Sequence, residues 1–152
     1  MAYTENLYGL DASAKARVTR YSEETLAISY PTDTYLPEGT PVKFTSGKLV
    51  AATNSRAIGI VKVSLAPSEN QAIRKGYATV LVYGLAEVTG KAGATIVAGD
   101  ELKFTGVESG TNKLLFAPAV STDTVVAFAG KAAANAADVE GVVMLCQSYI
   151  KE

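Results

Sequence analysis

Two pairs of adjacent carboxylates, Glu23 with Glu24 and Asp100 with Glu101, are the side chains of this sequence that come closest to a catalytic pattern. Two carboxylates that flank one glycosidic bond can hydrolyse it, one as the acid and the other as the base or nucleophile. Adjacent residues of an extended strand point to opposite faces, so neither pair offers both carboxylates to one substrate if the chain is extended there. We expect solvated turn acids instead of a catalytic pair.

The sequence has no histidine and one cysteine, Cys146. Histidine is the most frequent general acid and base near neutral pH, and its absence removes Ser-His-Asp sites, Cys-His sites and most zinc sites. The apolar run VVMLC around Cys146 predicts a buried thiol. The glycines of GKAGATIVAGD, residues 90–100, lack the Gly-Lys-Ser/Thr ending of a phosphate-binding loop. We therefore expect no enzyme, no cofactor, and no catalytic, cofactor-binding or metal-binding residue.

Charge is nearly balanced, with 14 basic and 15 acidic residues. We expect no nucleic acid partner, because phosphate binding usually brings a basic excess. The basic residues are scattered and are predicted to be solvated charges or rim contacts to an acidic protein surface; examples are Arg17, Arg20, Arg56, Arg74 and Lys75. No apolar run reaches the ~18 residues of a membrane span. The N-terminal residues lack the basic and apolar parts of a secretory signal, so we expect a soluble protein made in a cytoplasm.

Short apolar runs begin at residue 36, and Gly, Pro, Asn, Asp or Ser separates them every few residues. This rhythm is typical of an all-β chain, and the 13 glycines are suited to its turns. We expect a small β-barrel or sandwich with an internal pseudo-repeat and an extended N-terminal arm. The predicted strands lie near residues 41–45, 48–52, 57–65, 77–89, 101–105, 113–117, 125–129 and 139–149.

The longest predicted strand, 77–89, is apolar on both faces, with Tyr77, Leu81 and Tyr83 on one of them. A strand buried on both sides in so small a protein indicates a closed barrel or a face covered by another subunit. We expect a homo-oligomer in which Tyr77, Leu81 and Tyr83 contribute to a subunit interface.

The first 35 residues differ from the rest and are predicted to form an arm or linker, 1–35, before a single β domain, 36–152. The arm carries Tyr21, Tyr30 and Tyr35, and aromatic side chains bring a large contact area at low entropy cost. These tyrosines are predicted contacts with a neighbour or with a larger assembly. The alternative is an arm that folds back onto its own domain.

A short phrase occurs twice, in EGTPVKFTSGKLVAAT at residues 38–53 and in AGDELKFTGVESGTNKLLFAP at residues 98–118. The pairs at an offset of sixty residues are Gly39 with Gly99, Lys43 with Lys103, Phe44 with Phe104 and Thr45 with Thr105. After the hairpin the offset grows to sixty-five and aligns Leu49 with Leu114, because the second loop is longer. We interpret the β domain as two related halves, about 36–90 and 96–152, that share one core.

Turn glycines and short apolar strands follow one another in a set order in two stretches, 36–65 and 75–104. The positions that carry the pattern are Gly39, Gly47, Ala52, Ile58, Gly59, Val80, Val82, Gly84, Ala98, Gly99 and Asp100. In this order of elements the chain resembles the small capsid cement or decoration proteins of tailed bacteriophages, over about residues 36–129. The long arm and the small-residue stretch near the C-terminus depart from that family's pattern.

The resemblance implies a virion structural protein that binds the outer surface of the phage head and strengthens it. It implies the major capsid protein as partner and a homotrimer. No nucleic acid or membrane partner is expected, from the charge balance and the short apolar runs. The alternative function is a receptor- or carbohydrate-binding β module of a phage head fibre or tail. The absence of tryptophan counts against carbohydrate binding, since sugar platforms usually need exposed aromatic side chains.

Overall fold

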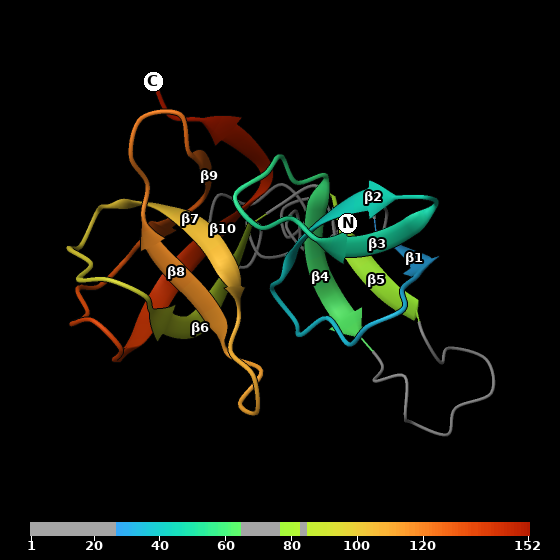
Figure 1. Cartoon of the computed structure of the whole chain (residues 1–152), viewed down its shortest axis with the longest axis horizontal. Coiled ribbons are helices and arrows are strands. Elements are labelled where there is room, and N and C mark those ends of the chain that lie inside the picture. The colour runs from blue at the N-terminus through green and yellow to red at the C-terminus, as the bar shows by residue number, and fades with distance from the viewer. Residues whose placement is uncertain (1–26, 65–76, 83–84) are drawn as a thin grey trace, which may run out of the picture.

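The computed structural model describes residues 27–64, 77–82 and 85–152, and these residues form ten β-strands and no helix (Figure 1). The expected all-β class is confirmed. The predictions near 41–45 and 101–105 match β2 and β7 closely. The strands in chain order are β1 (Ala27–Pro31), β2 (Pro41–Thr45), β3 (Lys48–Ala51), β4 (Gly59–Ser64), β5 (Tyr77–Leu81), β6 (Leu85–Ala92), β7 (Glu101–Val107), β8 (Leu114–Pro118), β9 (Thr124–Ala129) and β10 (Asp138–Ile150).

The strands form two sheets, one open and one closed. The open sheet has the order β1-β5-β4-β2-β3, and the other sheet closes into a barrel in the order β10-β6-β8-β7-β9. Figure 1 shows β1 to β5 on one side of the molecule and the barrel on the other. The prediction of one strand at 77–89 is wrong, because β5 belongs to the open sheet and β6 to the barrel. Leu81, Val82 and Tyr83 continue the apolar run past the end of β5, so the sequence shows no clear boundary between β5 and β6.

The two sheets repeat one arrangement. Written from β6 around the closed barrel, the barrel order is β6-β10-β9-β7-β8, which matches the open sheet β1-β5-β4-β2-β3 when β1 to β5 correspond to β6 to β10. Val42 of β2 lies opposite Gly59 of β4, and Leu102 of β7 lies opposite Ala127 of β9. The turn before β2 is repeated as well. Gly39 donates its amide to the Val61 carbonyl at 2.7 Å, and Gly99 donates its amide to the Ala129 carbonyl at the same distance. Each glycine has positive φ, 86° and 92°, which an L side chain rarely adopts.

The hairpins of the two sheets correspond differently from the sequence alignment. Phe44 lies opposite Leu49 in the first hairpin, and Phe104 lies opposite Phe116 in the second. Leu49 therefore corresponds to Phe116, and its predicted alignment with Leu114 is wrong. The reason is a bulge beyond Phe104 and a longer loop, which shift the register of β8 against β7.

The barrel closes where β6 runs parallel to β8 beside Lys91. Gly90 permits this close approach, since an added Cβ would lie 2.6 Å from the Leu114 carbonyl oxygen. In the open sheet β1 and β3 are not paired. The residues that correspond to Gly90 and Lys91 at the offset of sixty are Tyr30 and Pro31, and proline has no N–H to donate to a ladder.

The two unpaired edges of the open sheet, β1 and β3, face what we call the open seam. An ion pair lies there in place of strand pairing. Lys48 Nζ lies 2.7 Å from Asp33 Oδ1, and both side chains are largely exposed. An exposed pair of this kind stabilises a fold by about 1 kcal/mol at most. A groove of about 390 Å³ lies beside the pair.

Apolar side chains fill the barrel and continue into the open sheet. The fully buried large side chains of the barrel are Phe104, Phe116, Ile96, Leu102, Met144 and Val125. Ile60 and Leu81 of the open sheet belong to the same apolar cluster, so the two sheets share part of their core. Burying one such side chain contributes about 1.5 to 3 kcal/mol. A smaller cluster fills the open sheet and includes Val42, Leu49 and Val80.

The predicted arm overlaps the open sheet. β1 pairs with β5 in antiparallel register, so Ala27–Pro31 folds onto the chain's own sheet, as in the alternative considered for the arm. The two sheets run from Ala27 to Leu81 and from Leu85 to Ile150, whereas the predicted halves were about 36–90 and 96–152. None of the described residues forms a helix long and apolar enough to cross a membrane.

Candidate interaction surface

The tyrosines and leucine predicted as interface residues occupy different environments. Tyr21 and Tyr83 lie outside the described residues. The backbones of Tyr30 and Tyr77 take part in the pairing of β1 with β5. Tyr35 follows β1 and is 38% exposed, whereas Leu81 is 1% exposed and packs into the shared core. Of the predicted residues whose side chains the structure describes, Tyr35 is exposed and Leu81 is buried, so these two do not share a surface.

A polar junction joins the open sheet to the barrel through the connection between β3 and β4. Asn54 in this connection donates from Nδ2 to Asp123 Oδ1 at 2.9 Å. Its Oδ1 accepts the Thr124 amide at 2.9 Å, and its own amide donates to the Phe104 carbonyl at 3.0 Å. Asn54 has φ of 39°, a left-handed conformation that asparagine tolerates better than most residues. One residue of this connection thus contacts two separate segments of the barrel.

Asp123 is the centre of this junction. Its Oδ2 accepts from Lys103 Nζ at 2.8 Å and from the Val120 amide at 2.9 Å. The hydrogen bond from Lys103, followed by those from Val120 and Asn54, lowers the pKa of the Asp123 carboxyl from 3.8 to about 2. The carboxylate is therefore charged throughout the physiological range and keeps its donors in place.

A groove of about 210 Å³ lies beside the junction, and we call it the Arg56 groove. Its lining residues are Arg56, Thr124, Ser148, Tyr149 and Ile150. Ser148 Oγ accepts the Ala57 amide at 2.9 Å, which holds the segment of Arg56 against the end of β10. Tyr149 is 40% exposed and Ile150 is 58% exposed. The groove combines Arg56, from the connection between β3 and β4, with residues of β9 and β10, so it exists only where that connection meets the barrel.

Tyr149 is anchored on the barrel. Its ring lies 6.5 Å from the Phe128 ring, measured between centroids. Burial raises the pKa of the Tyr149 hydroxyl, and the Glu101 carboxylate raises it further. Lys151 Nζ lies 3.6 Å from Glu101 Oε2 and balances that charge. The hydroxyl is neutral at physiological pH and presents an amphipathic ring to the groove.

Arg56 differs from the lysines of the barrel half in having no acidic partner among the described residues. It is exposed, and within the described part of the chain it forms no ion pair. Every lysine of the barrel half, in contrast, has an acidic partner. The barrel's ion pairs are Lys91 with Glu108, Lys103 with Asp123, Lys113 with Asp138, Lys131 with Glu140 and Lys151 with Glu101.

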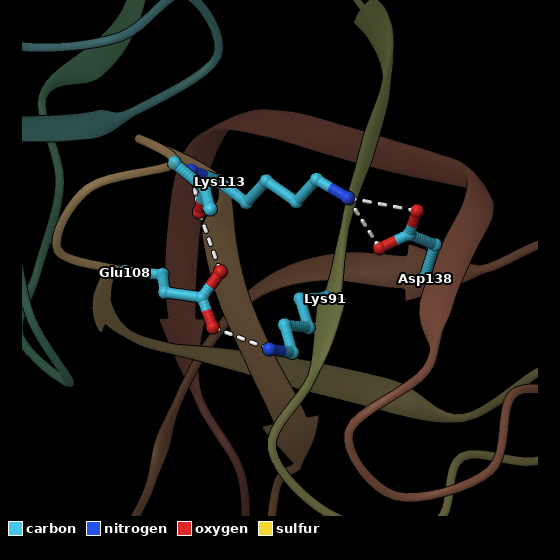
Figure 2. Close-up of polar contacts among 5 residues, drawn as sticks. Lys91, Glu108, Lys113 and Asp138 are labelled. Atoms are coloured by element: carbon cyan, nitrogen blue, oxygen red, sulfur yellow. Dashed lines mark hydrogen bonds and ion pairs between the residues drawn. The ribbon is translucent and has the colours of Figure 1, made fainter.

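Four of these charges lie together at the closed seam of the barrel. Figure 2 shows Lys113 reaching Asp138, with Nζ to Oδ1 and Oδ2 distances of 2.7 and 2.8 Å, while Glu108 faces Lys91. Hydrogen bonds from Lys91 and Thr111 lower the pKa of Glu108. Because Lys91 lies on β6 and Asp138 on β10, the two pairs tie the loop between β7 and β8 to both strands. The charges balance, and we assign this cluster a role in the fold.

Sequence reasoning placed Arg56 among scattered solvated or rim charges and did not single out Tyr149 or Ile150. Arg56 is far in the sequence from Tyr149 and Ile150. They become neighbours only because the connection between β3 and β4 packs against the end of β10. The adjacent large side chains Tyr149 and Ile150 were the one local signal in the sequence. In the part of the chain that the structure describes, no group of three or more acidic or cysteine side chains is placed to hold a metal ion.

No protein-family model matches the chain, and a search of curated proteins finds no match.

Proposed function

We propose that the protein is a structural component of a bacteriophage virion, a decoration or cement protein that binds the major capsid protein on the outside of the head. The order of turn glycines and apolar strands in residues 36–129 supports this proposal, as does the all-β architecture. The proposal assigns the chain a binding role and no catalysis.

The observation that carries the proposal is the Arg56 groove. Arginine and tyrosine are enriched among the residues that dominate protein interfaces, and large exposed apolar side chains beside them favour docking. Arg56, Tyr149 and Ile150 combine these properties on one exposed surface. The groove is held by hydrogen bonds within the chain, which lowers the entropy cost of binding a partner.

The mechanism is thermodynamic. A protein that binds only the assembled lattice stabilises that lattice by mass action, and the gain grows with concentration above the Kd. Presentation as a homotrimer adds avidity when three equivalent sites are within reach. Light scattering of the purified protein should therefore give the mass of three chains, and a monomer would remove the avidity part of the proposal.

The proposal is tested with heads of the phage that encodes the protein, prepared without it. We expect saturable co-sedimentation of the protein with assembled heads, density for it on their outer surface, and disruption of decorated heads at a higher temperature than bare ones. Absence of binding at micromolar concentration would contradict the proposal. Binding to host cells or glycans in place of heads would favour a receptor-binding module.

A further inference from the structure

We infer that the Arg56 groove binds a carboxylate with a neighbouring aliphatic side chain, in an exposed segment of the partner protein. This inference rests on the proposed function, since the partner is then the capsid shell protein. It narrows the acidic protein surface considered for the scattered basic residues to one carboxylate beside an aliphatic side chain, bound at one groove.

The charge of the groove selects an acidic ligand. Arg56 has no ion-pair partner within the described residues, and none of the five lining residues is acidic. Glu101, the acid beside Tyr149, is balanced by Lys151. A guanidinium offers two parallel N–H donors to a carboxylate, a geometry that ammonium groups lack.

The apolar side of the groove selects an aliphatic neighbour for that carboxylate. Ile150 is 58% exposed and Tyr149 is 40% exposed, so a methyl-bearing side chain can be covered by both. Burial of such a side chain removes water from the ion pair, which strengthens the pair in the lower local dielectric. An acid next to Leu, Ile or Val in an extended segment presents both groups.

The backbone around Arg56 is already held in place. Asn54 is bonded to the barrel on one side of Arg56, and the Ala57 amide donates to Ser148 Oγ on the other. Binding therefore orders the Arg56 side chain and leaves the backbone as it is. This geometry favours a single docking mode over a diffuse electrostatic contact.

The first test compares three variants of the full chain in head binding. Arg56→Ala should weaken binding by about thirtyfold, because truncating one member of a desolvated charge pair leaves the other unpaired. Arg56→Lys keeps the charge and loses the paired donors, so its loss should be smaller. Lys43→Ala is the matched control, since Lys43 also lacks an ion pair among the described residues and lies outside the groove. Heads that bind wild type and Arg56→Ala equally would overturn the inference and leave the proposed function standing.

The second test does not depend on phage heads. A displayed library of random linear peptides is selected against the wild-type protein, with Arg56→Ala as the counter-selection. We expect enriched peptides to carry Asp or Glu beside Leu, Ile or Val, and to lose binding when that acid becomes Asn or Gln. Failure to enrich any peptide, or enrichment of peptides without acids, would overturn the inference. If such peptides bind while heads do not, the proposed function fails and the ligand chemistry remains.

Discussion

Asp123 shows at the scale of one residue how the junction is held. Its carboxylate accepts from the side chain of Lys103, from the backbone of Val120 and from Asn54 in the connection between β3 and β4. These donors lower its pKa to about 2. A carboxyl whose pKa is lower in the folded state than in the unfolded chain stabilises the fold while it is charged.

This linkage predicts the pH dependence of the junction. The stabilisation from Asp123 is fully present above its ordinary pKa of 3.8 and is lost as the pH falls through about 2. Asp123→Asn should lower the unfolding temperature at pH 7, and the gap to wild type should narrow between about pH 4 and pH 2. Thermal unfolding followed by circular dichroism measures both proteins, and their other acids cancel in the difference. A gap that stays constant with pH would contradict the assignment.

Asn54 is the second residue of the junction whose loss can be measured cleanly. Asn54→Gly removes its side-chain bonds to Asp123 and Thr124 and still tolerates the positive φ. We expect the free energy of unfolding to fall by about 2 kcal/mol, because two bonds with a usual net value of about 1 kcal/mol each are lost. Denaturant titration measures the change.

The matched control is Asn112→Gly. Asn112 has φ of 56°, and no hydrogen bond of its side chain is found within the described residues. The same exchange at this position should change stability by less than about 0.5 kcal/mol. Equal losses at both asparagines would show that the backbone, and not the junction, is responsible.

At the scale of elements, most strands could be predicted and their register could not. Runs of β-branched and aromatic residues bounded by turn residues predicted β2 and β7. The alignment of Leu49 with Leu114 failed because one bulge in β7 changes which residues lie opposite each other. A bulge depends on pairing between strands, and the sequence of one strand does not record it.

The closed seam gives a prediction at this scale. A Cβ at Gly90 would lie 2.6 Å from the Leu114 carbonyl oxygen and 2.7 Å from the Phe116 ring, and neither a ladder carbonyl nor a core ring can move freely. Gly90→Ala should therefore destabilise the protein by about 1 to 3 kcal/mol, the range for overpacking. At Gly93 the nearest atom would be 3.4 Å away, so Gly93→Ala is the control and should cost little. Denaturant midpoints that fall equally would contradict the account of barrel closure.

At the scale of the whole molecule, the candidate site was missed because it lies between the open sheet's β3–β4 connection and the barrel. The sequence repeat around Phe44 and Phe104 pointed to two related units, and the shared strand order agrees with it. The Arg56 groove belongs to neither unit alone. It forms where the connection after β3 meets the end of β10, and contacts between segments so far apart in the chain leave no periodic signal in the sequence.

The difference between the two sheets gives the last prediction. In the barrel the Gly93 amide donates to the Phe116 carbonyl at 2.7 Å, across the seam that joins β6 to β8. The residue sixty positions before Gly93 is Asp33. In the open sheet β1 and β3 are not paired, and the Asp33 side chain instead forms an ion pair with Lys48. Exchange of a seam amide requires the seam to open, which costs more for a closed barrel than for an unpaired edge.

Amide exchange measured by NMR should therefore give Gly93 a protection factor at least about a hundredfold above that of Asp33, after correction for intrinsic rates. Lys48→Ala serves as a probe, because it breaks the ion pair and should leave Gly93 unchanged. Equal protection at the two positions would mean that β1 and β3 pair in solution, so that both repeats are closed barrels and the open seam is not a feature of the protein.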